Sequence, residues 1–175
     1  MTDELNKHLA EPETPIWDAS NPDESFSRYA DFLHRKAKWT FLKDKTHVEI
    51  IFMFRPAGEG ILLLVQGDRD AFVVKLKELI QSSDIIGVVH IAEAWARFGG
   101  DNDHTTRQIM FGEMAISDLL PEHRTEALFV SMQSRAGQSS CWIDPIIRNK
   151  KIGDICLQEG FKLDKVEGRF GRLFG

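Results

Sequence analysis

The sequence predicts an α+β fold in which two helices pack on a mainly antiparallel sheet, preceded by an acidic N-terminal arm. Two β-rich runs, 48–54 and 61–65, are separated by Pro56 and two glycines, which favours a hairpin. Apolar residues recur with helical spacing before and after this hairpin, and further apolar runs follow from residue 85. A chain of 175 residues with 42% hydrophobic residues is sufficient for one domain whose core needs no metal or disulfide.

The first helix is predicted over residues 22–38. Asn21 is expected to cap it through its side chain, with Pro22 in the first turn and Glu24 three residues after the cap. Five apolar residues then share one face of the helix: Phe26, Tyr29, Ala30, Leu33 and Ala37. The basic residues near the predicted C-terminus are His34, Arg35, Lys36 and Lys38. They suit the negative pole of the helix dipole, so we expect them to face solvent.

The second helix is predicted over residues 69–82. Asp68 follows a glycine that ends the preceding strand, and its carboxylate can cap the first turn. The face expected to pack on the sheet comprises Phe72, Val73, Leu76, Leu79 and Ile80.

Further strands are predicted after this helix. The run 85–98 begins as a nearly continuous apolar stretch, as expected of a central strand covered on both faces. Strands are also expected over 126–134 and 141–147, with a short element near 152–157. Pro145 cannot donate a backbone hydrogen bond, so it predicts an edge strand or a bulge at that point.

The net charge of -5 is unevenly distributed along the chain. Residues 1–25 sum to -6 and the remaining residues to +1. We therefore expect residues 1–21 to form a flexible acidic arm and residues 22–175 to form a single domain. Trp17 is expected to fold back onto that domain, since burial of its side chain contributes a few kcal/mol. Deletion of residues 1–20 is nevertheless expected to leave stability largely intact.

Composition also restricts the environment and the partners. Two cysteines, Cys141 and Cys156, are too few for a disulfide framework, which favours a reducing, cytoplasmic location. The sequence lacks a secretory signal and a long apolar run, so no membrane partner is expected. Net acidity argues against nucleic acid as the main partner.

The run 85–98 contains the densest set of candidate functional residues. On a strand, Glu93, Trp95 and Arg97 share one face and His90 lies on the other, so His90 and Glu93 are not expected to form a dyad. A structural ion pair with a base such as Arg135 is the expected role of Glu93, and a hydrogen-bonded core position that of His90. If the chain is an enzyme, its catalytic candidates are His90, Glu93, Arg97 and His123, and its ligand-binding candidates are Trp95, Arg97 and Arg124.

Other catalytic and metal patterns are weaker. A second polar cluster comprises Asp101, Asp103, His104, Glu113, Glu122 and His123. It has no diagnostic metal-ligand spacing, so we predict a solvated loop with no metal and no cofactor. Nothing near Cys141 would lower its thiol pKa, and a small buried residue is the expected role.

One family resemblance rests on two segments. His90-Ile-Ala-Glu-Ala-Trp95, followed by Pro121-Glu-His-Arg124 and Glu126-Ala-Leu-Phe-Val-Ser131, resembles a strand-loop-strand pattern of an uncharacterised bacterial protein family. The resemblance covers about residues 85–135 and implies a bacterial origin and two paired strands. It implies no particular reaction.

Three functions remain open from the sequence. The first is a binding or interaction module that self-associates as a homo-oligomer and has a protein or small-molecule partner. The second is a small hydrolase or transferase with its site at the Glu93, Trp95 and Arg97 end of the sheet. The third is a nucleic-acid-associated accessory protein that uses the basic C-terminal third of the chain.

Overall fold

A computed structural model describes residues 10–97, 104–105, 108, 113–149, 154–164 and 170–174. The helices are α2 (Pro22–Asp44) and α3 (Arg69–Ser82), and short 3-10 turns span Ile116–Asp118 and Pro121–His123. The strands are β1 (Ile50–Phe54), β2 (Gly60–Leu64), β3 (Gly87–Ala96), β4 (Thr125–Ser134), β5 (Ser139–Asn149), β6 (Asp154–Leu157) and β7 (Phe161–Leu163). The predicted α+β class is confirmed, with two helices and a mainly antiparallel sheet in the described part of the chain.

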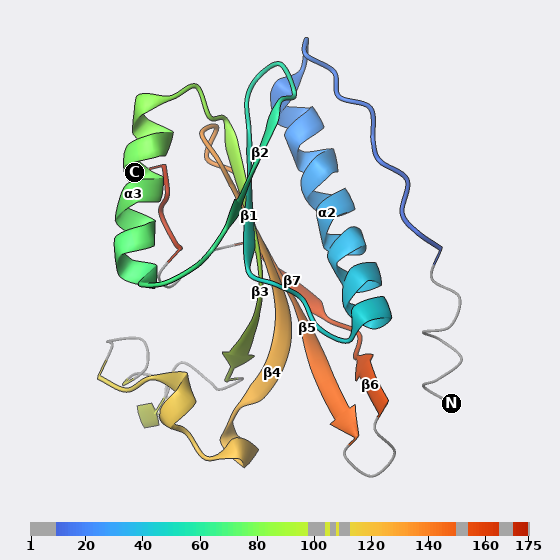
Figure 1. The fold of residues 1–175 in the computed structure, drawn as a ribbon, viewed down its shortest axis with the longest axis vertical. Coiled ribbons are helices and arrows are strands. Elements are labelled where there is room, and N and C mark those ends of the chain that lie inside the picture. The colour runs from blue at the N-terminus through green and yellow to red at the C-terminus, as the bar shows by residue number, and fades with distance from the viewer. Residues whose placement is uncertain are drawn as a thin grey trace.

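The strands form a curved antiparallel sheet in the order β2-β1-β3-β4-β5-β6, with β7 pairing a different part of β5 (Figure 1). The predicted hairpin is β1 and β2, and the predicted central strand is β3, between β1 and β4. Of the two alternatives predicted at Pro145, an edge strand or a bulge, the edge strand is wrong, because β5 has strand partners on both sides. Pro145 lies between the part of β5 that pairs β7 and the part that pairs β6, where no ladder donor is required.

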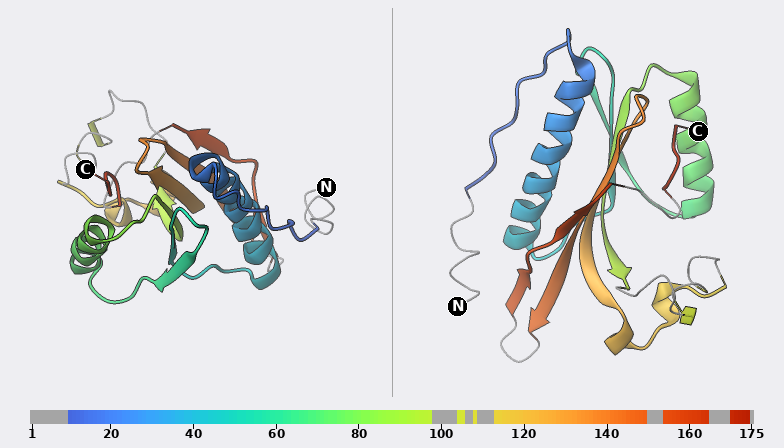
Figure 2. Two further views of the ribbon diagram at one scale, coloured as in Figure 1. Left: turned by 90° about the horizontal axis from the view of Figure 1, so that it is seen from above. Right: turned by 180° about the vertical axis from the view of Figure 1, so that it is seen from behind.

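The two helices cover opposite faces of the sheet, as Figure 2 shows from above. Alternation along β3 directs Val89 to the core beneath α2 and Val88 to the core beneath α3. The larger core joins α2 to β1, β3, β4 and β5, whereas the α3 core reaches mainly β1, β2 and the start of β3. The α3 side of β4 and β5 therefore carries less helical cover than the α2 side.

Helix α2 is longer than predicted and begins differently. Its apolar face continues to Phe41, which is fully buried, so the helix runs to Asp44. Asn21 makes no side-chain cap; its amide donates instead to Glu24 at 2.6 Å. Because the helix continues, the basic cluster lies inside it, and the expectation that His34 and Lys38 face solvent is wrong. Both contact the buried carboxylate of Asp144.

Helix α3 follows the prediction more closely. Asp68 accepts hydrogen bonds from the backbone N–H groups of Asp70 and Ala71, as expected of a cap. Val73, Leu76 and Ile80 are buried against the sheet, but Leu79 is exposed and does not belong to the packed face.

The arm is partly docked onto the domain. Trp17 stacks on Phe54 with ring centroids 5.7 Å apart and donates from Nε1 to the carbonyl of Pro56 at 3.0 Å, which confirms that it folds back. Residues 1–9 lie outside the described residues. No described helix has the length and apolar character needed to cross a membrane.

Candidate functional site

A cavity of about 940 Å³ lies on the sheet face that α3 covers only in part. It is lined by Glu49, Arg69, His90, Ala92, Glu93, Ala94, Trp95, Glu126, Phe129, Ser131, Cys141, Ile143, Leu163, Asp164 and Phe170. Its size falls at the upper end of the range usual for small-molecule pockets, about 300–1,000 Å³.

The floor of the cavity is built by strand register. His90 pairs with Ser131, and Ser131 pairs with Cys141, so these three side chains form a row across β3, β4 and β5. The next row in the same direction contains Ala92, Phe129 and Ile143. The small side chains of β3 leave space above the sheet, and the surface beneath that space is mostly apolar.

One wall of the cavity carries a polar triad. Glu49 lies just before β1 and bonds His90 Nε2 through Oε1 at 3.0 Å and Arg69 through Oε2 at 2.6 Å. The side chains of Glu49 and His90 are both largely buried. The His90 ring also packs on Phe170, with centroids 4.1 Å apart, so its orientation is held from two sides.

This environment keeps Glu49 ionised. Partial burial pushes the pKa of its carboxyl upward, but the hydrogen bonds and charges of His90 and Arg69 outweigh burial and hold the pKa below its usual value. A carboxylate that orients a histidine on a cavity wall is an arrangement used in acid–base catalysis and in ligand binding.

The end of β3 that holds Glu93 forms a separate ionic cluster. Arg148 bonds Glu126 at 2.6 Å and Glu93 at 3.1 Å, and Glu93 also accepts from Thr46 Oγ1 at 2.9 Å and from the backbone N–H of His47. Hydrogen bonding to Glu126 is the main reason that the pKa of Arg148 is raised. These contacts join the segment after α2 to β3, β4 and β5.

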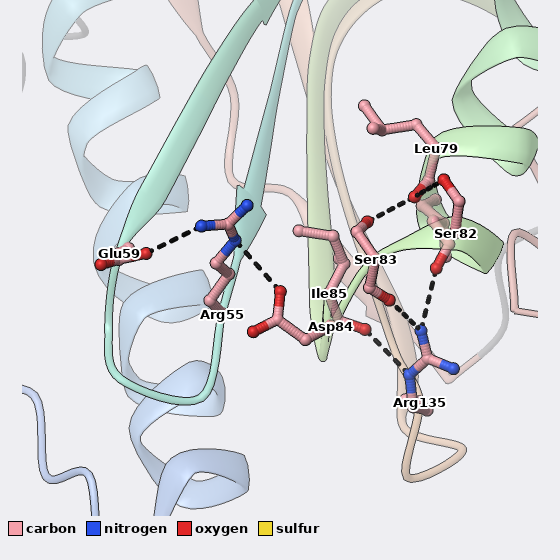
Figure 3. A network of polar contacts seen from close by, with 9 residues as sticks. Arg55, Glu59, Leu79, Ser82, Ser83, Asp84, Ile85 and Arg135 are labelled. Atoms are coloured by element: carbon pink, nitrogen blue, oxygen red, sulfur yellow. Dashed lines mark hydrogen bonds and ion pairs between the residues drawn. The ribbon is translucent and has the colours of Figure 1, made fainter.

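The expected structural ion pair of Glu93 is therefore confirmed, but its partner is Arg148 and not Arg135. Arg135 instead donates to three backbone carbonyls, those of Ile80, Ser83 and Ile85 (Figure 3). It lies in the turn after β4, whereas Glu126 lies at the start of β4 and pairs with Trp95 near the end of β3. Arg135 thus joins the end of α3 to the start of β3 through hydrogen bonds.

The remaining predicted site residues do not lie together in one site. Arg124 lies over the Trp95 ring at 4.3 Å, so these two predicted ligand-binding residues do come together. Among the described residues, neither Arg97, just after β3, nor His123, in the second 3-10 turn, lines the cavity. His90 and Glu93 point to opposite faces, as the alternation predicts.

Most residues of the cavity were missed by sequence reasoning, among them Glu49, Arg69, Ser131 and Phe170. The sequence pattern could have identified Glu49 as a candidate, because the alternation of β1 places it on the same buried face as Ile51 and Met53. An acid on that face requires a partner. The identity of the partner depended on the register of β1 with β3, which the sequence pattern does not determine.

Cysteine and metal chemistry have little support here. Burial raises the pKa of the Cys141 thiol to about 12, as expected of a small buried residue. Within the described ranges, no group of three or more potential metal ligands comes together. Asp101 and Asp103 lie outside those ranges.

Comparison of the chain with protein-family models, with curated proteins and with solved structures yields no match. The functional argument therefore depends on the geometry of the cavity.

Proposed function

We propose that this chain is a binding protein whose ligand is a small, largely apolar molecule held in the cavity over β3, β4 and β5. The observation that carries the proposal is the combination of about 940 Å³ of space, an apolar floor and a polar wall built by Glu49, His90 and Arg69. Pockets of this kind bury the body of a ligand against apolar side chains and orient it with a few polar groups.

The polar wall favours an uncharged end group on the ligand. Glu49 and Arg69 are 2.6 Å apart and balance each other's charge, so a charged ligand group would meet one attractive and one repulsive partner. A hydroxyl or carbonyl group can instead exchange hydrogen bonds with His90 or Arg69. The expected ligand thus has an apolar body and a neutral hydrogen-bonding end.

Fluorescence of N-phenyl-1-naphthylamine, an apolar probe, tests the cavity directly. We expect it to bind the full chain and to be displaced more strongly by octanol than by octanoate or octylamine. Ala94→Phe places a ring in the cavity and should weaken probe binding about tenfold or more. The matched control Val74→Phe, at an exposed site on α3, should bind the probe as the original chain does. Equal binding by Ala94→Phe and the original chain would contradict the proposal.

A second candidate function, hydrolysis, is favoured by one observation. Glu49, just before β1, His90 of β3 and Ser131 of β4 follow one another in the order acid, base and hydroxyl. Because Nε2 of His90 bonds Glu49, Nδ1 is the nitrogen that would accept the proton of Ser131. As Ser131 Oγ adds to an ester carbonyl, His90 takes that proton and returns it to the departing alcohol. Water then repeats the step, releasing the acid and restoring Ser131.

Hydrolysis of p-nitrophenyl acetate tests this second function. Ser131→Ala and His90→Asn should each reduce the rate to that of the uncatalysed reaction, and Glu49→Gln should reduce it partially. His104→Asn, at an exposed histidine, controls for general imidazole catalysis. If all variants react at one rate, the cavity binds without catalysis. The Glu93, Trp95 and Arg97 end is the weaker place for an enzyme site, since Glu93 is engaged by Arg148.

We also propose a cytoplasmic location and, from the resemblance of residues 85–135, a bacterial origin. Support for the location comes from Cys141 and Cys156, which are both free thiols.

A further inference from the structure

The strand β2 forms one edge of the sheet, and its outer side has no strand partner among the described residues. Figure 1 shows it between α2 and α3, with neither helix laid across it. Edge strands in monomeric proteins are usually protected by charges, proline or a bulge. The β2 sequence, Gly60-Ile-Leu-Leu-Leu64, contains no charged residue and no proline.

Backbone hydrogen bonds show which residues of β2 face outward. Val65 N donates to Glu49 O at 3.1 Å and Arg55 N donates to Glu59 O at 3.0 Å. In an antiparallel pair, hydrogen-bonded residues alternate, so Ile61 and Leu63 also direct their backbone groups toward β1. Gly60, Leu62 and Leu64 consequently direct their N–H and C=O groups away from the sheet.

The side chains of this edge add an apolar surface. Leu62 is 55% exposed and Leu64 is 53% exposed. They pair with Phe52 and Ile50, which pack against the core beneath α2. The exposed leucines therefore extend the core to the edge of the molecule, where a partner strand would cover them.

We propose that two copies of this chain associate through β2, in an antiparallel pair related by a two-fold axis at Leu62. This register places Leu62 opposite Leu62 of the second copy and Gly60 opposite Leu64. It pairs every outward-facing residue of β2 with an outward-facing residue, whereas a shift to either side leaves some unpaired. Gly60 has no side chain, so the large Leu64 of the other copy has room beside it.

Self-complementarity is the reason for assigning a second copy as the partner. A two-fold pair uses the same surface on both molecules and closes on itself, giving a dimer rather than a fibre. The uncharged strand offers no charge pattern to select a different protein. The ligand cavity lies over β3, β4 and β5, so dimer formation does not depend on the proposed binding function.

Sedimentation velocity of the full chain over a wide concentration range tests the dimer. We expect a reversible monomer–dimer equilibrium whose dissociation constant rises about tenfold or more in Leu62→Lys and in Leu64→Lys, because charge would be placed in the pair. Val74→Lys changes a comparably exposed apolar residue on α3 and should leave the equilibrium unchanged. Circular dichroism confirms that each variant is folded. A monomer at every concentration, or a dimer that both edge variants retain, would overturn the proposal.

Cross-linking tests the register, in a Cys156→Ser background. Residues opposite each other in a hydrogen-bonded pair have Cα atoms about 5.5 Å apart, which a disulfide can span. Leu62→Cys should therefore form a disulfide-linked dimer on mild oxidation. Leu64→Cys should not, because its two copies would be separated by about four residues along the strands, or roughly 13 Å. Equal cross-linking at both positions would refute this register.

Discussion

Asp144 of β5 and His34 of α2 form a buried hydrogen-bonded pair, with Oδ2 and Nε2 2.6 Å apart. Lys38, one turn further along α2, donates to the other carboxylate oxygen at 2.9 Å. The His34 ring also stacks on Trp142, with centroids 5.2 Å apart. These contacts attach the middle of α2 to β5, so the helix is fixed over the sheet by polar as well as apolar contacts.

The substitution Asp144→Asn tests how strongly these contacts hold α2 to β5. The carboxylate is 2% exposed, and its loss leaves Lys38 without the counter-ion that it has beneath the helix. We expect the free energy of unfolding in urea to fall by about 3 kcal/mol. Asp31→Asn is the matched control, because Asp31 is an exposed α2 residue 4.0 Å from Lys162, and it should change stability by less than about 0.5 kcal/mol. Equal stability of the two variants would contradict a structural role for Asp144.

Acid sensitivity should follow from the same residue. Burial pushes the pKa of Asp144 upward, but hydrogen bonds and charges from His34 and Lys38 outweigh it and lower the pKa below 3.8. A depressed pKa in the folded state contributes stability that is present above the unfolded pKa and is lost as the pH falls through the folded pKa. Urea unfolding from about pH 6 to about pH 2 should show this loss below about pH 4, and Asp144→Asn should have a flatter profile. If the free energy of unfolding falls equally with pH in the original chain and in Asp144→Asn, the loss of stability in acid comes from other groups.

Trp17 makes the arm part of the folded domain. Because it packs on Phe54 and Tyr29 and bonds Pro56, we expect deletion of residues 1–20 to lower the melting temperature, contrary to the expectation from charge alone. Trp17→Ala should account for most of this destabilisation and lower the free energy of unfolding by about 2 kcal/mol. Ile16→Ala, at a side chain that is 88% exposed, should have no measurable effect. An unchanged melting temperature after deletion of residues 1–20 would show that the arm does not contribute to stability.

Local sequence patterns were sufficient for most of the elements. Turn residues identified the β1–β2 hairpin, and Asp68 identified the start of α3. The patterns failed where an element's end depended on tertiary packing. Helix α2 continues to Asp44 because Phe41 is buried by the sheet, and no local stop signal at residue 38 reveals this.

The candidate site was less accessible, because it depends on contacts between distant residues. His90 was recognised as a residue in need of a hydrogen-bond partner, but Glu49 lies 41 positions away and meets it only through the β1–β3 register. Arg135 shows the reverse error. Its charge suggested an acidic partner, whereas it donates to three backbone carbonyls between the end of α3 and the start of β3.

Thiol reactivity should distinguish the two cysteines. Burial raises the pKa of Cys141 to about 12, from an ordinary value of 9.0, so its thiolate fraction at neutral pH should be about 1,000-fold below that of an unperturbed thiol. Cys156 is less buried and should react with a disulfide reagent soon after mixing. In Cys156→Ser, we expect labelling of the native chain to be slow and labelling in urea to be fast. The Cys141→Ser chain should label rapidly under both conditions. Rapid labelling of native Cys156→Ser would show that the floor of the cavity opens to solvent, and it would count against the rigid sheet face on which the proposed binding site is built.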